Sequence, residues 1–335
     1  MKRPIKKVNP RIKKELLRLI LALLVIVLTV SCNSRSSLST PSLGNSPSQP
    51  ELFWEGFIST QYYERDIAIS KTGNEIIYTL GDYKQTKRAL VSTKLLNGEW
   101  SAPEILGFSG EYQDIEPFLS QNDNRLYFAS NRPLHNTDES NDYNLWYSER
   151  QNGEWSSPVA LDTIINTEGD EFYPSLSENG NLYFTASKPT GIGSEDIFMS
   201  KYINHSYMTP VVLDSAINTK TFEFNAYVSP KEDLLIFSSY GRKDDMGGSD
   251  LYYSVKNAQG NWKEAKNMGP TINSDKLDFC PFIDWERNNF YFTSERIISE
   301  ESIISSVDEL KASANRTLNG YGNIFRISLD ELNLD

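Results

Sequence analysis

The chain has 335 residues, of which 39% are hydrophobic, 12% aromatic and 23% charged, a composition that excludes wholesale disorder. Its formal net charge is −12, and eight of its Lys and Arg residues precede residue 32, so the remainder is more acidic still. An extended nucleic-acid-binding surface is therefore excluded, because phosphates would be repelled. Two Cys and two His argue against a structural zinc cluster.

Residues 1–31 have the pattern of an export signal. A basic leader precedes the apolar run Leu19 to Ser31, which is shorter than the roughly 20 residues that a spanning helix needs. The run ends in Leu-Thr-Val-Ser before Cys32, which resembles the bacterial lipoprotein processing box. In that family the signal is cut before the Cys, so the resemblance implies that Cys32 carries lipid, palmitate included. An ordinary secretory signal with an incidental Cys is the alternative.

Residues 32–50 are predicted to be a lipidated Cys followed by a disordered tether. The stretch from Asn33 to Pro50 is rich in Ser, Pro, Gly and Asn, so it buries too little apolar surface to offset its conformational entropy. Asn33 is not the Asp that resembles an inner-membrane retention signal, and no acidic cluster resembling a surface-export signal follows Cys32. We therefore expect an outer-membrane lipid anchor on the periplasmic face, with surface exposure left open.

Residues 51–335 contain one motif repeated five times, at intervals of about 50 residues. The copies begin at Glu64, Asp114, Glu171, Glu223 and Asp278. Each continues through a polar turn into an aromatic run and two further apolar runs, the last of which we centre on Trp100, Trp155, Tyr207 and Trp262. Four short strands per repeat predict an all-β fold, a single β-propeller.

Five four-stranded blades are predicted, and a sixth would need a blade that the sequence does not show. The fifth copy lacks its last strand, so we expect the N-terminal segment Glu51 to Ser59 to close the ring against it. The block D-x-x-P-x-x-S, turn, L-Y-F-x-S-x-R, loop, D-I-Y-x-S resembles the WD-like repeat of TolB, of peptidase propellers and of many envelope lipoproteins. This resemblance covers residues 51–335 and implies the fold rather than a function.

Acidic residues at the starts of the first strands are expected to form a ring at the channel mouth. This structural acidic ring comprises Glu64, Asp114, Glu171, Glu223 and Asp278. A basic rim follows the second strands at Arg132, Lys188, Arg242 and Arg296. Residues repeated in every blade favour architecture, so we expect acid–base pairs that hold the loops. The functional alternative is a polar cup for a sugar or peptide.

The third position of the first strand differs from copy to copy, and such positions are better candidates for binding. The binding candidates are Asp66, Glu116, Tyr173 and Asn225, with Cys280 at the fifth copy. Asp66 and Glu116 come from adjacent blades, and paired carboxylates are what glycoside hydrolysis requires. Five-bladed glycosidases resemble this arrangement, but they have a third carboxylate where this chain has Tyr173.

Two other stretches, a Gly-rich loop and an insertion, are candidate functional elements. Asp244, Asp245 and Asp250 lie in a Gly-rich loop that could hold a calcium ion, although its spacing is not that of a known calcium loop. Residues 297–322 form an insertion on the mouth face, in which Ser299 is expected to cap a helix through Ala314 that packs on the rim or acts as a lid. Otherwise no cofactor or metal is expected.

Two functions follow from these patterns. The first is a non-catalytic envelope lipoprotein whose propeller binds a protein, peptide or glycan, and no nucleic acid, at its channel mouth. The second is a glycan-active enzyme that uses Asp66 and Glu116. The regular repeat and the scarcity of catalytic residue types favour the first, whereas two unpaired channel carboxylates about 5–10 Å apart would favour the second.

Overall fold

A computed structural model describes residues 42–44, 46–297 and 303–334. The chain divides into two compact units, Met1–Pro41 and Ser42–Asp335. The predicted signal and Cys32 lie outside the described residues. Within the described ranges, no helix has the length and apolar character needed to cross a membrane.

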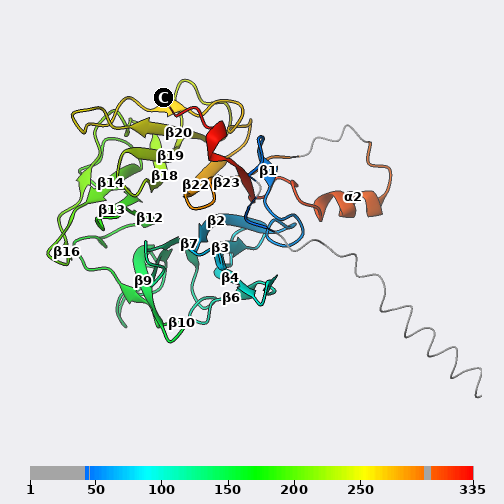
Figure 1. Cartoon of the computed structure of the whole chain (residues 1–335), viewed down its shortest axis with the longest axis horizontal. Helices are drawn as coiled ribbons and strands as arrows, with labels where there is room; N and C mark the ends of the chain where they lie inside the picture. Colours follow the sequence, from blue (N-terminus) through cyan, green and yellow to red (C-terminus); the bar gives the residue numbers. More distant parts are fainter. Residues whose placement is uncertain (1–41, 45, 298–302, 335) are drawn as a thin grey trace, which may run out of the picture. The chain divides into compact units, whose positions relative to one another are not determined.

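Five antiparallel sheets form a five-bladed β-propeller, as the repeat predicted (Figure 1). Each blade runs from a first strand nearest the axis to a short outer strand. Blade 1 contains β2 (Tyr63–Ile69), β3 (Glu75–Gly81), β4 (Arg88–Leu96), β5 (Glu99–Trp100) and β6 (Glu104–Ile105). Blade 2 contains β7 (Asp114–Leu119), β8 (Arg125–Ser130), β9 (Asn144–Gln151), β10 (Glu154–Trp155) and β11 (Val159–Ala160).

Blades 3 to 5 repeat this plan. Blade 3 contains β12 (Glu171–Leu176), β13 (Leu182–Ala186), β14 (Asp196–Ser200) and β17 (Val211–Val212), beside the hairpin β15 (Tyr202–Ile203) and β16 (Ser206–Tyr207). Blade 4 contains β18 (Phe222–Val228), β19 (Leu234–Tyr240), β20 (Asp250–Val255) and β21 (Lys266–Asn267). Blade 5 contains β22 (Asp278–Asp284), β23 (Asn289–Ser294), β24 (Asn323–Ser328) and β1 (Glu51–Leu52), and the 3-10 helix η1 (Leu329–Glu331) follows β24.

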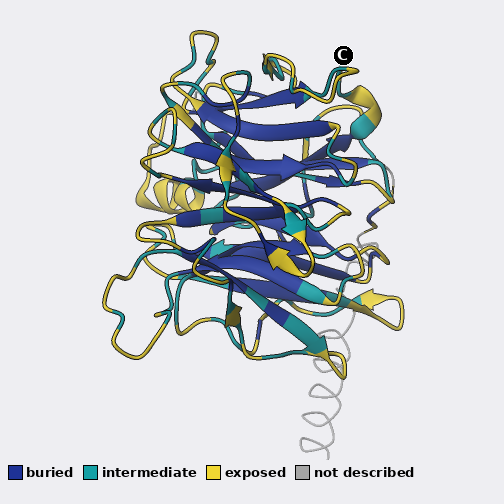
Figure 2. Ribbon diagram, turned by 90° about the vertical axis from the view of Figure 1, so that its left-hand side faces the viewer, coloured by how far each residue is buried: buried dark blue, intermediate teal, exposed yellow. Residues whose placement is uncertain are grey.

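The aromatic runs of the second and third strands build the core between blades. Phe184 stacks on Phe198 in blade 3, and Phe292 stacks on Phe325 in blade 5, with ring centroids 5.9 and 5.6 Å apart. These rings are almost fully buried, and Figure 2 shows most of the length of the inner strands as buried. Because both faces of each sheet pack against neighbouring blades, the strands are continuous apolar runs rather than alternating ones.

The N-terminal strand closes the ring, as expected. Strand β1 pairs antiparallel with β24, with Glu51 opposite Arg326 and Leu52 opposite Phe325. Phe53 extends the pairing through its N–H to the carbonyl of Ile324 at 2.8 Å, and its side chain is fully buried. The outer edge of blade 5 is therefore covered by a segment from the other end of the described chain.

The prediction that the outer strands centre on aromatics is confirmed in blades 1 and 2, whose sheets end in β5 with Trp100 and β10 with Trp155, and it is wrong in blades 3 and 4, whose sheets end in β17 and β21. Trp100 and Trp155 lie in short strands that pair with the end of the third strand, and a further short strand pairs with the same third strand four or five residues later, as Ile105 opposite Val91 illustrates. Tyr207 lies in the hairpin of β15 and β16 and Trp262 in an isolated bridge to Lys256, and β17 and β21 follow four or five residues later. The Pro residues after the aromatics turn the chain before it pairs again, because Pro cannot donate to a strand ladder.

The last part of the predicted tether lies against blade 5. Leu43 is buried, and its carbonyl accepts a hydrogen bond from the Asn289 amide at 3.1 Å. The Ser328 N–H donates to the Pro47 carbonyl at 2.7 Å. This contact differs from the expectation of a disordered stretch through Pro50, and it arises because Leu43 finds an apolar site beside blade 5.

Candidate functional site

The four binding candidates meet at the centre of the ring. Each first strand contains a β-bulge at the second residue after its acidic start, and all five of these residues have positive φ between 50° and 61°. They are Asp66, Glu116, Tyr173, Asn225 and Cys280. A bulge re-aims its side chain, and here the bulges bring five different side chains into one cluster. We call these residues, together with Arg65, the central cluster.

Arg65 holds both channel carboxylates. Its Nε donates to the Asp66 carboxylate at 2.8 and 3.0 Å, and a terminal nitrogen donates to Glu116 Oε1 at 2.9 Å. The same nitrogen lies 3.5 Å from the Cys280 sulfur, and the guanidinium stands over the Phe279 ring at 4.9 Å. Arg65 was not among the site residues expected from the sequence. Its signal was a charge at a position where the other copies have Ile115, Phe172, Phe224 and Phe279.

Glu116 joins the blades across the centre. Its Oε2 accepts the backbone N–H of Tyr173 at 2.7 Å, and its Oε1 accepts the amide of Asn225 at 3.2 Å. At the bulges of Asp66, Glu116 and Asn225, the corresponding N–H donates to a Thr hydroxyl on the neighbouring blade. The bulge at Tyr173 faces blade 2, which has Ala129 at the position of that Thr. The Tyr173 N–H therefore donates to the Glu116 carboxylate instead.

The central cluster is closed and has little net charge. Asp66 and Glu116 are 1% and 4% exposed. Burial raises the pKa of Glu116 to about 7, and the nearby Arg65 lowers it only in part. Near neutral pH Glu116 therefore exchanges between its neutral and its charged form while it stays within hydrogen-bond distance of Arg65.

Four members of the acidic ring pair with the basic rim inside their own blades. The pairs are Arg132 with Asp114 at 2.5 Å, Lys188 with Glu171 at 2.8 Å, Arg242 with Glu223 at 3.1 Å and Arg296 with Asp278 at 3.2 Å. All four carboxylates are buried. The basic groups also donate to carbonyls such as those of Ile165, Ile217 and Ile272, so each pair ties the second strand to the loop before the first.

Glu64 differs from the other four. Blades 2 to 5 each have a basic residue just after the second strand, whereas blade 1 has Asp82 there. The Glu64 carboxylate accepts hydrogen bonds from the Thr60 N–H at 2.9 Å, the Thr60 hydroxyl and the Asn323 amide at 3.0 Å instead. Burial raises its pKa to about 7, since the hydrogen bonds only partly offset the loss of hydration.

The Gly-rich loop uses its carboxylates internally. The Tyr252 hydroxyl lies 2.9 Å from a carboxylate oxygen of both Asp244 and Asp245 and has one hydrogen to share between them, and Asp250 accepts the Met246 N–H at 2.8 Å. Asp196 accepts the Ile192 N–H in the corresponding loop of blade 3, so Asp250 occupies a repeated structural position. Among the described residues, no group of three or more His, Cys, Asp or Glu side chains could hold a metal ion.

The insertion carries a short exposed helix, α2 (Val307–Ala314). Ser306 caps it, and Glu309 completes a capping box, so the helix begins seven residues after the expected cap at Ser299, which lies outside the described residues. None of its residues is buried, so the expectation that it packs on the rim is wrong for the described part of the insertion (Figure 2). The Ser-x-x-Glu spacing was the sequence signal for the correct start.

Comparisons with known proteins yield no family and only distant structural neighbours. No family model matches the chain, and no curated protein does. A thermostable family-43 glycoside hydrolase is 10% identical with a TM-score of 0.49 and 81% and 91% of the two chains covered. The GH43 endo-arabinanase from Bacillus licheniformis is 11% identical with a TM-score of 0.47 and 85% and 96% covered.

TolB from Acinetobacter baumannii is a third neighbour, at 9% identity and a TM-score of 0.42. The match covers 78% of this chain but spans only 54% of TolB. What the two proteins share is the path of a propeller chain. The function must therefore be argued from this chain's own residues.

Proposed function

We propose that the chain is a non-catalytic lipoprotein of the bacterial cell envelope, anchored through Cys32 in the outer membrane. Its propeller binds a protein, peptide or glycan at the mouth of the channel. The observation that carries the non-catalytic part is that Arg65 ion-pairs with both channel carboxylates. The signal and the Cys32 motif, which are sequence observations, support the anchoring.

The pairing with Arg65 argues against glycoside hydrolysis. That reaction needs one carboxyl group to protonate the leaving oxygen and another to attack the sugar or activate water. Asp66 and Glu116 are both buried, and their oxygens already accept hydrogen bonds from Arg65, Tyr173 and Asn225. A sugar would have to displace a buried ion pair before either group could react, which costs several kcal/mol.

The insertion supports binding at the mouth. Ile303, Val307 and Leu310 are 92%, 67% and 54% exposed, although they lie on or just before a capped helix. A helix of eight residues is marginal in water on its own, and exposed apolar side chains on such an element are typical of contact with another molecule. We therefore place the partner against α2 and the adjoining mouth.

A site-specific crosslinker tests the partner. A photoreactive amino acid at Leu310 should give one discrete adduct in intact cells, and Val307→Asp should abolish it by placing a charge in the apolar contact. The same probe at Gln259, an exposed turn residue in blade 4, serves as the control. Equal adducts from both positions, or none from Leu310, would contradict binding at the insertion.

Metabolic labelling tests the anchor. Labelled palmitate should enter the wild-type chain and not the Cys32→Ser variant, and only the wild type should fractionate with outer membranes. Equal labelling of both chains would refute the lipoprotein part of the proposal and leave the partner experiment unaffected.

Glycan hydrolysis remains the second candidate, because one observation favours it. A pKa of about 7 suits Glu116 to act as a general acid at neutral pH. If this candidate holds, purified protein should release reducing sugar from neutral polysaccharides, and Glu116→Gln should remove that activity without loss of folding. Unchanged activity in Glu116→Gln would exclude Glu116 as the acid.

A further inference from the structure

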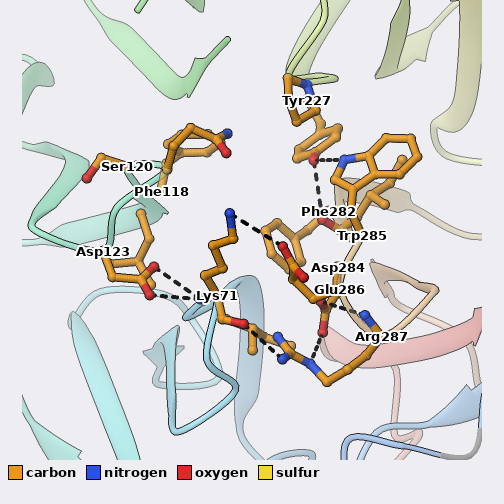
Figure 3. Close-up of a pocket in the computed structure, with 15 residues that line it drawn as sticks. Lys71, Phe118, Ser120, Asp123, Tyr227, Phe282, Asp284, Trp285, Glu286 and Arg287 are labelled. Atoms are coloured by element: carbon orange, nitrogen blue, oxygen red, sulfur yellow. Dashed lines mark hydrogen bonds and ion pairs between the residues drawn. The ribbon is translucent and has the colours of Figure 1, made fainter. Parts of the chain in front are cut away.

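A pocket opens on the face opposite to the channel mouth, where the first strands end (Figure 3). Its volume is about 270 Å³, and blades 1, 2, 4 and 5 contribute to it. Four aromatic residues form much of its wall: Phe118, Tyr227, Phe282 and Trp285. The sequence patterns predicted a site at the mouth and none on this face.

The aromatic wall is held in place by specific contacts. The indole N–H of Trp285 donates to the Tyr227 hydroxyl at 2.8 Å, and that hydroxyl donates to the Ile283 carbonyl at 3.2 Å. Phe282 meets Tyr227 edge to face, with ring centroids 5.8 Å apart. Trp285 nevertheless remains 45% exposed. The pocket therefore presents a flat apolar ring to solvent in a fixed orientation.

The fold does not require Trp285. The corresponding positions after the other four first strands are Lys71, Gln121, Glu178 and Pro230. These polar or small residues build the same turn in their blades, so a tryptophan here has no architectural role that the repeat explains. An exposed aromatic residue at a position that breaks the repeat indicates a contact surface.

Charges of both signs line the pocket: Lys71 and Arg287 are basic, and Asp123, Asp284 and Glu286 are acidic. Lys71 Nζ lies 3.6 Å from Glu286, and Arg287 binds Asp284 at 2.6 Å and the Ser70 carbonyl at 3.0 Å. Lys71 and Glu286 are 60% and 51% exposed, so solvent screens this pair and a ligand can open it at little cost. The Asp123 carboxylate accepts the Lys71 backbone N–H at 2.9 and 3.1 Å. Three carboxylates against two cations disfavour an anion, and a neutral ligand with hydroxyl groups can use both the donors and the acceptors.

We infer that this pocket binds a neutral saccharide. One sugar ring lies on the exposed indole of Trp285, and its hydroxyls accept from Lys71 and donate to Glu286. The volume is just below the range of about 300–1,000 Å³ that is usual for ligand pockets, which suits one ring of a glycan. This site lies on the other face from the mouth, so it is independent of the proposed partner.

The test is direct binding of defined sugars to the mature protein. An array of neutral mono- to trisaccharides identifies the best ligand, and calorimetry with that sugar gives the dissociation constant. Trp285→Ala should weaken binding at least tenfold, and Trp285→Phe should lose less because a flat ring remains. Lys71→Met should weaken binding severalfold by removing one donor. Thermal melts establish that each variant is folded.

Tyr62→Ala is the matched control, since Tyr62 is 51% exposed and immediately precedes the first strand on the mouth side. It should bind the sugar as the wild type does. The inference is overturned if no neutral saccharide on the array binds, if Trp285→Ala binds as tightly as the wild type, or if arginine amide binds the pocket while the sugars do not.

Discussion

Arg65 is the residue on which the centre of the ring depends. It is the cation nearest to Asp66 and Glu116, and its own side chain is only 11% exposed. The sequence pointed to Asp66 and Glu116 as a carboxylate pair from adjacent blades and to no cation beside them. The structure instead places a guanidinium against both, so neutralising the cation is the costly change.

Replacing Arg65 should therefore destabilise the protein strongly. Arg65→Met leaves two buried carboxylates without a cation and should cost about 3–5 kcal/mol in urea unfolding. Adding Asp66→Asn and Glu116→Gln should restore most of that loss, and Asn tolerates the positive φ of residue 66. A triple variant as unstable as Arg65→Met would show that packing of the side chain, rather than charge, is what matters.

Glu64 should make stability depend on pH. Its pKa of about 7 in the folded protein exceeds the ordinary 4.5, so the folded state retains a proton that the unfolded chain releases between these values. The resulting stabilisation is fully present below about pH 4.5 and is lost as the pH rises through 7. Glu116 contributes in the same direction over the same range.

Glu64→Gln should remove part of this dependence. The variant should lose less stability than the wild type between pH 5 and pH 8, by about 1–3 kcal/mol, when urea midpoints are compared at each pH. Glu104→Gln, which changes an exposed residue, is the control. If Glu64→Gln and the wild type have parallel pH profiles, Glu64 is charged in the folded protein at pH 5.

At the scale of the elements, the loop that leads into each first strand is fixed by one side chain. Five residues before each acidic start lies Asn166, Asn218, Asn273, Ser59 or Ser109. The Asn218 side chain accepts the Ile197 N–H at 2.8 Å and donates to the carbonyls of Ile197 and Leu213 at 3.0 and 2.9 Å. Ser59 makes the two corresponding bonds to Ile324. The side chain thus joins the third and outer strands to the next blade.

Removal of this side chain should be costly. Asn218→Ala leaves buried backbone groups of Ile197 and Leu213 without partners and should lower the free energy of unfolding by about 1–3 kcal/mol. Asn218→Ser, the residue that blades 1 and 5 use, should lose less. Asn261→Ala in an exposed turn is the control. Equal losses in the Ala and Ser variants would mean that the hydrogen bonds contribute little.

For the whole molecule, ring closure depends on β1 and the residues that follow it. Deleting Glu51 to Ser59 removes the fully buried Phe53 and Ile58 and exposes the edge of β24. We expect a loss of several kcal/mol and self-association through the open edge, seen in thermal melts and size-exclusion chromatography. Deletion of residues 33–41 instead should leave the melting temperature unchanged. A closure-deleted chain that melts like the wild type and stays monomeric would contradict this account.

The sequence by itself determined the architecture, because the same local preferences for strands and turns occur in all five copies of the repeat. Runs such as Leu182-Tyr183-Phe184 can be buried only between sheets, and the missing last strand implied closure by the N-terminal segment. The repeat also indicated which positions vary between copies. This variation identified four binding candidates: Asp66, Glu116, Tyr173 and Asn225. Patterns that recur with the period of the blade are readable without coordinates.

Only the tertiary structure decided what those varying residues do. Arg65 contacts Glu116 from 51 positions away and Cys280 from 215, and Trp285 meets Tyr227 across blades. Such pairs depend on the bulges, the closure of the ring and the direction of each side chain, none of which has a local sequence signal. Local strand pairing and burial therefore make the blades predictable from the sequence. The centre of the ring and the pocket on its far face depend instead on how the five blades meet.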